Sequence, residues 1–291
     1  MFRKSLALIA AVALAACATS SDPKSQFAFD GARLDAVLSA QPADVQARYE
    51  WRHPKETLEF FGVAPGMTVV DTLPGEVWYA GILADYLGPD GEVVGADYSP
   101  EMWKLFGGFV NEEFLARKAT WANDWVAGSA KWAPAEGAKI SAFAYGAVPE
   151  RLKGKVDVLL LVRAMHHFNR FEDEGGWRTA ALEDVMAVLK PGGIVGVVQH
   201  RAPEGNSDQW AEGDNGYLKQ SQVIAAFDAA GFEFVGSSEV NANPADHPTE
   251  SDVVWRLPPS LATSRNDPAL RARMEAVGES DRMTLKFRKP R

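Results

Sequence analysis

Two aspartates in this sequence are placed where they could bind a nucleoside. Asp71 ends the short apolar segment 67–71, and Asp97 ends the similar segment 92–97; a Pro-Gly turn and an apolar run lie between them. In open α/β sheets ligands bind beyond the carboxyl ends of parallel strands, and an acid after the second strand can accept hydrogen bonds from both ribose hydroxyls. Asp97 is therefore a candidate ribose ligand, with capping of the next helix as the alternative.

Two adjacent histidines follow another apolar segment. The sequence RAMHHFN, which contains His166 and His167, comes directly after segment 156–162. A histidine at this place could act as a general base toward a substrate hydroxyl or amine. The alternative is a pair that packs in a loop and bonds to the backbone. Because adjacent residues rarely face the same site, we expect only one of the two to act.

Composition and spacing disfavour several other chemistries. The net charge of −9, from 30 basic and 39 acidic residues, argues against nucleic acid as a partner. The single cysteine permits no intramolecular disulfide and no cysteine-rich zinc site, and the five histidines lack HExxH or similar spacing, so no metal is expected. Walker, GxSxG and complete GxGxxG sequences are absent, which disfavours ATPases, α/β-hydrolases and NAD-dependent dehydrogenases.

Strands and helices alternate along the chain and must position these residues. We expect strands at 67–71, 92–97, 140–145, 156–162, 194–199, 232–240 and 282–287. Helical patterns cover 30–61, 77–87, 99–118, 177–189, 220–230 and 269–277, and the sequence KPGG at 190–193 is expected to form a turn. This alternation predicts a doubly wound α/β domain with a mainly parallel sheet of seven strands. The last two strands lack a full crossover helix, which indicates antiparallel pairing at one edge.

The first residues form a leader. A basic start and eleven apolar residues, too short to span a bilayer, precede the sequence LAAC, which resembles the lipobox of bacterial lipoproteins. In that family the cysteine, here Cys17, becomes the first mature residue and carries the lipid. We therefore expect a signal peptide at 1–16, a tether at 17–29 and one domain at 30–291. Ala18 favours an outer-membrane lipoprotein on the periplasmic side; the alternative is an uncleaved amphipathic start with an incidental cysteine.

From about residue 45 to the end, the sequence resembles the class I S-adenosylmethionine-dependent methyltransferases, and among them a group of predicted exported bacterial proteins. The resemblance rests on the segments RHPKETLEFFGVAPGMTVVD, WYAGILADYLGPDGEVVGAD, VDVLLLVRAMHHF, VLKPGGIVGVVQHRA and SDRMTLKFRKP. It implies seven strands with the last one antiparallel, and S-adenosylmethionine as the cofactor. Asp71 and Gly75 would then hold the amino-acid end of the cofactor, Asp97 its ribose, and His166 or His167 would lie near the acceptor.

The first loop departs from the family pattern acid-x-Gly-x-Gly-x-Gly. Leu73 and Val77 stand where the outer glycines are expected, Glu76 adds a negative charge, and only Gly75 remains. We expect this loop to bind the cofactor less well than a glycine loop does, because glycine allows close backbone approach and β-branched valine is stiff. Two functions follow: methyl transfer to a small-molecule acceptor, or a non-catalytic binding or scaffolding lipoprotein of the same fold. No residue pattern predicts the oligomeric state.

Overall fold

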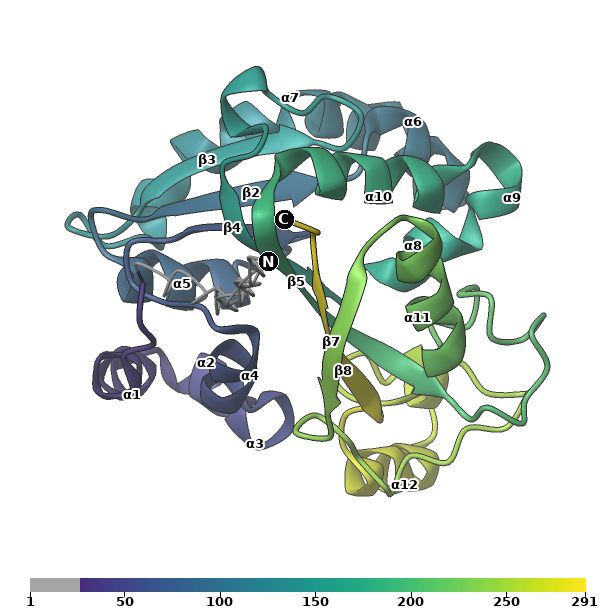
Figure 1. Cartoon of the computed structure of the whole chain (residues 1–291). Helices are drawn as coiled ribbons and strands as arrows, with labels where there is room; N and C mark the ends of the chain where they lie inside the picture. Colours follow the sequence, from purple (N-terminus) through teal and green to yellow (C-terminus); the bar gives the residue numbers. More distant parts are fainter. Residues whose placement is uncertain (1–26) are drawn as a thin grey trace, which may run out of the picture.

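A computed structural model describes residues 27–291, and the predicted signal peptide, Cys17 and the tether up to residue 26 lie outside it. The described chain folds around one sheet in the order β3-β2-β1-β4-β5-β8-β7, with a short β6 paired to β5 beside this path (Figure 1). The strands are β1 (Thr68–Thr72), β2 (Glu92–Asp97), β3 (Lys139–Ala144), β4 (Val156–Val162), β5 (Leu189–Ala202), β6 (Leu218–Lys219), β7 (Glu233–Ser238) and β8 (Arg282–Arg288).

The pairing confirms the predicted doubly wound, mainly parallel sheet with an antiparallel last strand. Strands β1 to β5 pair in parallel, and β8 runs antiparallel to both β5 and β7. The antiparallel strand β8 lies inside the sheet, and β7 forms the edge. The eighth strand, β6, was not predicted because two residues are too few to show a period.

The central strand β4 shows why the sheet is buried on both faces. Its residues alternate between two separate apolar cores: Leu159 and Leu161 belong to one, Val158 and Leu160 to the other. A strand covered on both faces reads as a continuous apolar run, as VDVLLLV does. The first core is completed by residues of α8, α10 and α11, and the second by residues of α1, α4 and α5.

Twelve α-helices surround this sheet in the described residues. They are α1 (Gly31–Ala40), α2 (Ala43–Gln46), α3 (Tyr49–Arg52), α4 (Pro54–Phe61), α5 (Trp78–Leu87), α6 (Pro100–Trp103), α7 (Glu112–Ala127), α8 (Met165–Arg170), α9 (Glu172–Gly175), α10 (Trp177–Val188), α11 (Gln220–Ala229) and α12 (Pro268–Val277). The helical region 30–61 is divided into the four helices α1 to α4, with breaks at 41–42, at 47–48 and at His53, which adopts a left-handed conformation before Pro54.

The prediction of one helix over 99–118 is wrong. Ser99 caps α6 by accepting a hydrogen bond from the backbone N–H of Met102, as expected, but α6 ends after one turn. A 3₁₀ turn then stops at Gly107, whose φ is 76°, and α7 starts afresh behind the capping side chain of Asn111. The Gly-Gly pair at 107–108 interrupts the helix because glycine tolerates this conformation and stabilises a helix poorly.

The segment KPGG at 190–193, predicted to form a turn before the next strand, is a bulge within β5. Pairing along β4 and β5 jumps from Val156–Leu189 to Val158–Ile194, and Gly192 takes a φ of 78°. The extra residues therefore belong to one long strand that carries Gln199 and His200 to the carboxyl edge of the sheet.

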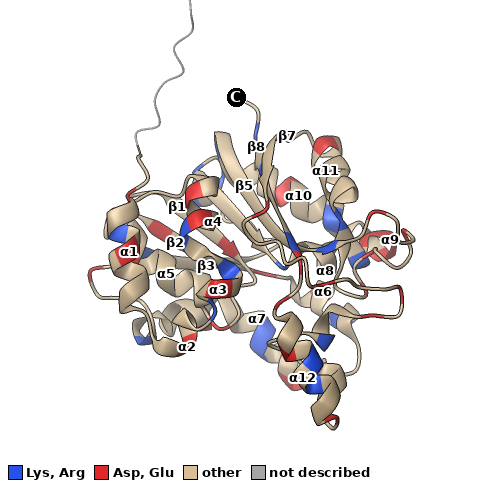
Figure 2. Ribbon diagram, turned by 90° about the horizontal axis from the view of Figure 1, so that it is seen from below, with Lys and Arg blue, Asp and Glu red and all other residues tan. Residues whose placement is uncertain are grey.

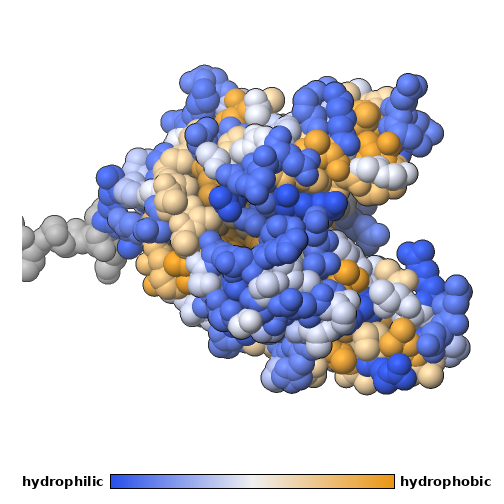
Figure 3. Space-filling model, turned by 90° about the vertical axis from the view of Figure 1, so that its right-hand side faces the viewer, coloured by the Kyte–Doolittle hydropathy of each residue, from blue (hydrophilic) through white to orange (hydrophobic). Residues whose placement is uncertain are grey.

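The outside of the molecule is mainly polar. Residues of both charge signs lie close together on exposed helices such as α1 and α12 (Figure 2), and the face in Figure 3 is largely hydrophilic with separate apolar patches. Between residues 27 and 291 no helix combines the length and the apolar character needed to cross a bilayer.

Candidate functional site

The loop after β1 has left-handed backbone at two residues that are not glycine. Leu73, Gly75 and Val77 have φ values of 54°, 54° and 58°, all in the left-handed region. Leucine rarely adopts this conformation, and for β-branched valine it is a genuine outlier. Both side chains pack partly buried against the two cores, while Gly75 and Glu76 are exposed. The loop is therefore strained at both residues, and the packing of their side chains holds them there.

Asp71 lies at the start of this loop with one carboxylate oxygen unpartnered. The side chain is 3% exposed, and its Oδ2 has no hydrogen-bond partner. Burial raises the pKa of Asp71 to about 7, although the backbone N–H of Ala80 and the charge of Arg163 both lower it. A buried acceptor without a donor suits a ligand that brings an N–H group.

Asp97 is fully engaged by the protein itself. Its Oδ1 accepts from the backbone N–H of Tyr98 at 2.8 Å, and its Oδ2 accepts from Nζ of Lys118 at 2.7 Å. Burial raises the pKa of Asp97, and the ammonium group of Lys118 opposes that shift. Asp97 does not cap α6, since Ser99 does. A ribose at this position would have to share or displace Lys118.

Tyr98 connects the two ends of the candidate site, a role that no local pattern in the sequence predicts. Its hydroxyl lies 3.2 Å from the carbonyl oxygen of Ala164 and 3.0 Å from Nδ1 of His167. Because β1 lies between β2 and β4, the buried Tyr98 side chain reaches across the carboxyl end of β1. Its ring also stacks on Phe106, within a group of aromatic side chains that follows β2.

The two histidines have different environments. His166 is buried, and its Nδ1 lies 3.2 Å from Oε1 of Gln199, whose Nε2 donates to the carbonyl oxygen of Gly216. This amide orientation makes His166 Nδ1 the donor and leaves Nε2 with a free lone pair. Burial lowers the pKa of His166 to about 4, so it is neutral at pH 7. His167 instead packs edge-on against Tyr98 and Phe106.

Arginines gather beside His166, at the ends of β4 and β8. Arg163 follows β4 with a φ of 56°, and Arg282 starts β8 opposite His200 of β5. Arg52, from α3, and Arg282 both bond to Glu279. No local pattern in the sequence joins residues so far apart. The one available signal is the position of Arg163 directly after a buried strand.

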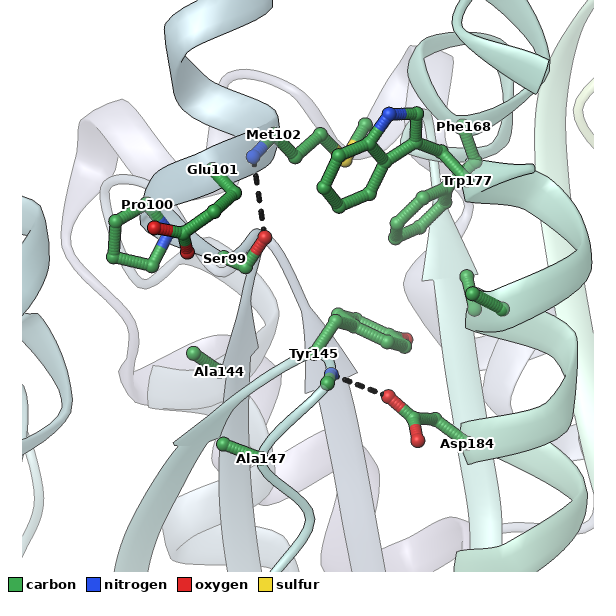
Figure 4. A pocket seen from close by; sticks show the side chains of 13 residues that line it. Ser99, Pro100, Glu101, Met102, Ala144, Tyr145, Ala147, Phe168, Trp177 and Asp184 are labelled. Atoms are coloured by element: carbon green, nitrogen blue, oxygen red, sulfur yellow. Dashed lines mark hydrogen bonds between the residues drawn. The ribbon is translucent and has the colours of Figure 1, made fainter. Parts of the chain in front are cut away.

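A cavity lies next to Asp97 on the side of β3. Its volume is about 300 Å³, and it is lined by Ser99, Pro100, Glu101, Met102, Ala144, Tyr145, Gly146, Ala147, Phe168, Trp177, Ala180, Ala181 and Asp184. In Figure 4 Trp177, Phe168 and Asp184 lie across from Ser99 and Glu101, and Asp184 accepts from the backbone N–H of Gly146 at 2.6 Å. The mainly apolar walls with a few polar groups are typical of a small-ligand site. In the described part of the chain, no group of three metal-ligating side chains is present.

The structure thus brings Asp71, Asp97, Gly75 and the histidines to one edge of the sheet. No family model and no curated protein matches the chain. A chain in the complex of the Haloferax volcanii Trm112 methyltransferase activator with a protein assigned as a methyltransferase superposes with a TM-score of 0.51 and 19% identity, over 89% of this chain and 96% of that one. The cyclase SpnF (TM-score 0.47, 19% identity, 82% and 80% coverage) and a methyltransferase from Aquifex aeolicus (0.45, 19%, 73% and 94%) are also similar. The chain has the fold of the class I S-adenosylmethionine-dependent methyltransferases.

Proposed function

We propose that the protein transfers a methyl group from S-adenosylmethionine to a small-molecule acceptor. The observation that carries this proposal is the left-handed backbone at Leu73, Gly75 and Val77. Left-handed backbone at leucine and valine costs roughly 1–2 kcal/mol per residue. Strain of this kind persists where the surrounding structure needs a particular loop path.

The residues at the site fit the cofactor in most respects. The unpartnered Oδ2 of Asp71 can accept a hydrogen bond from the ammonium group of a methionine moiety. Asp97 at the end of β2 can accept hydrogen bonds from a ribose if Lys118, whose side chain is 19% exposed, releases Oδ2. The apolar cavity beside Ser99 and Tyr145 has room for a flat ring.

The chain's own residues would bind and orient the reactants and remove a proton. S-adenosylmethionine supplies an already activated methyl group, so alignment carries most of the catalysis. His166 is the better candidate base of the two histidines because its Nε2 lone pair is free, whereas His167 packs in the aromatic group. Its low pKa of about 4 makes it a weak base that suits an acidic acceptor.

A second candidate function is non-catalytic binding of a ligand or partner by a lipoprotein of this fold. The ion pair of Asp97 with Lys118 favours it, because it occupies a carboxylate that the ribose of a cofactor would use. The contact of Tyr98 with His167 favours it as well, because it engages a histidine expected near the acceptor. Glu76, exposed in the first loop, adds a negative charge close to the expected carboxylate of the methionine.

Calorimetric titration of the purified full chain with S-adenosylmethionine separates the two functions. Saturable binding that Asp71→Ala weakens supports the enzyme, and Asp124→Ala, at an exposed site on α7, is the matched control. Absence of binding in a folded protein favours the non-catalytic function. Incubation of the protein with labelled cofactor and envelope extracts then tests for methyl transfer.

Attachment to the cell envelope through Cys17 is part of the proposal. The sequence LAAC behind a basic, apolar leader supports it. Several acyl chains hold a protein on a membrane firmly, whereas one chain binds only marginally. Cys17→Ser should therefore leave the protein soluble or unprocessed. The same mass and membrane fraction for variant and wild type would exclude lipidation at Cys17.

A further inference from the structure

The arginines at the ends of β4 and β8 are not balanced by the acids around them. Arg48, Arg52 and Arg282 all pair with one carboxylate, that of Glu279. Arg52 and Arg282 are 5% and 2% exposed, and Glu279 is 4% exposed. Three guanidinium groups thus share one buried negative charge, and a fourth arginine, Arg163, lies within electrostatic reach of Glu279 and Arg282.

Arg163 has no protein partner for its charge. Its backbone N–H donates to the carbonyl oxygen of Val198, but its guanidinium group makes no hydrogen bond or ion pair with any residue from 27 to 291. The side chain is partly buried, and burial lowers its pKa. Its φ of 56° is a conformation that arginine rarely adopts. The fold therefore holds a partly buried cation, at a strained backbone position, whose guanidinium group is not paired with an acid.

A second unsatisfied donor lies in the same cluster. Nη1 of Arg282 donates to Glu279 at 3.0 Å, but its Nε is buried and has no partner. The neighbouring His200 lies with Nδ1 2.6 Å from Oγ of Ser280. Burial, and after it the positive charges nearby, lower the pKa values of both His200 and His166. Both histidines are therefore neutral and cannot balance the charge of the arginines. Asp71 is the other acid in electrostatic reach of Arg163, and burial disfavours its charged form.

We infer that this cluster binds an oxyanion, the carboxylate or phosphate group of a small-molecule acceptor, with Arg163 as its direct ligand. A guanidinium group matches either oxyanion with two parallel hydrogen bonds, and such charge-assisted bonds are about twice as strong as those between neutral groups. The anion would supply the charge that Glu279 alone does not. Its place beside His166 would present the rest of the acceptor to the free Nε2 atom. That the ligand is the acceptor rests on the proposed function; the anion site itself does not.

The test uses the full chain without S-adenosylmethionine, titrated separately with inorganic phosphate and with succinate by calorimetry. Saturable binding of either probe is expected, and preference for one identifies the phosphate or the carboxylate as the group recognised. Arg163→Gln should weaken binding by about ten- to a hundredfold, because a hydrogen bond to a charged group is lost. Arg163→Lys should weaken it less, since the charge stays but the fork is lost.

Two further variants make the result decisive. Arg163→Asn should fold normally, because asparagine tolerates the positive φ at this position, and it should lose anion binding because the guanidinium group is gone. Arg117→Gln, at an arginine whose side chain is 62% exposed, should bind as the wild type does. Equal affinity of the wild type and Arg163→Asn, or only a weak response that every variant shares, overturns the inference. Anion binding without cofactor binding would reject the proposed function and keep this site; the reverse would reject this site alone.

Discussion

Two neighbouring regions at the carboxyl edge of the sheet treat their polar groups in opposite ways. Beside β2, Asp97 is satisfied from within by Lys118 and by the backbone of Tyr98. Beside β4 and β8, Arg163 and one N–H group of Arg282 have no partner in the described structure. In the first region the protein itself satisfies the charged group, and in the second region the positive charges outnumber the negative ones. Folding does not require the unpaired positive charge of the second region, which is why we propose a ligand there.

The comparison depends first on Glu279 being the main counter-charge of the arginines. Glu279→Ala should lower the free energy of unfolding by about 3–5 kcal/mol, because it leaves buried charges uncompensated. Urea denaturation measures this loss. Added phosphate should restore part of the stability of the variant if the cluster accepts an oxyanion.

The control for Glu279→Ala is Glu275→Ala. Glu275 pairs with Arg271 on α12, and both side chains are about half exposed. An exposed pair is worth only about 0–1 kcal/mol, so little change is expected. Similar losses in the two variants would show that Glu279 does not neutralise the cluster.

Substitutions in the Asp97 region should have the next largest effect. They should change the affinity for the cofactor in opposite directions for Asp97 and Lys118. Asp97→Ala should weaken adenosine or S-adenosylmethionine binding by about ten- to a hundredfold, since it removes a charged acceptor. Lys118→Met should strengthen binding, because it frees Oδ2 from its 2.7 Å contact. Calorimetry on both folded variants measures the change. Unchanged affinity in both would remove Asp97 from the site.

The sheet could be predicted from the sequence, but most of the site's electrostatics could not. Strand β4 is a continuous apolar run, and Asp71 and Asp97 each end an apolar segment, so the local sequence places them correctly. Arg52 and Arg282 are more than 200 residues apart in the chain and meet only through the tertiary fold. Local patterns carry no information on such contacts.

The loop after β1 and the break after α6 lie between these extremes, because the local sequence held only part of the information. The glycines at 107 and 108 carried the signal for the break after α6, yet the apolar pattern around them favoured one helix. At Leu73 and Val77, residue type argued against left-handed backbone, and the surrounding fold overrode that preference. Propensity predicts a conformation where packing is neutral, and fails where packing decides.

The pH dependence of stability should separate Asp71 from His166. The folded pKa of Asp71, about 7, lies above its ordinary 3.8, so its contribution is complete below pH 4 and is lost as the pH rises to 7. The folded pKa of His166, about 4, lies below its ordinary 6.5, so its contribution is present above pH 6.5 and is lost as the pH falls to 4.

These opposed slopes predict opposite effects of two variants. Asp71→Asn should make stability rise more steeply between pH 4 and 7, and His166→Gln should flatten that rise, each by at most about 1.4 kcal/mol per pH unit. Urea denaturation at pH 5 and 6 provides the measurement. Parallel profiles for the wild type and Asp71→Asn would show that Asp71 titrates in the folded protein as it does in the unfolded chain.

The smallest effect tests whether the loop after β1 is strained. Val77→Gly removes a β-branched residue at a φ of 58°. Relief of roughly 1–2 kcal/mol is offset by the greater freedom of glycine in the unfolded chain and by lost side-chain contacts, so stability should stay level or rise by up to about 1 kcal/mol. Val126→Gly is the matched control: Val126 packs partly buried against the same core but lies in the right-handed helix α7, and its loss should cost about 1 kcal/mol or more. Equal losses in the two variants would show that the left-handed backbone stores no strain.

The double variant Glu76→Gly, Val77→Gly should also bind S-adenosylmethionine more tightly than the wild type, because it removes a like charge and opens the backbone to the ligand. Weaker binding by that variant would mean that Leu73 and Val77 form a working cofactor loop of their own.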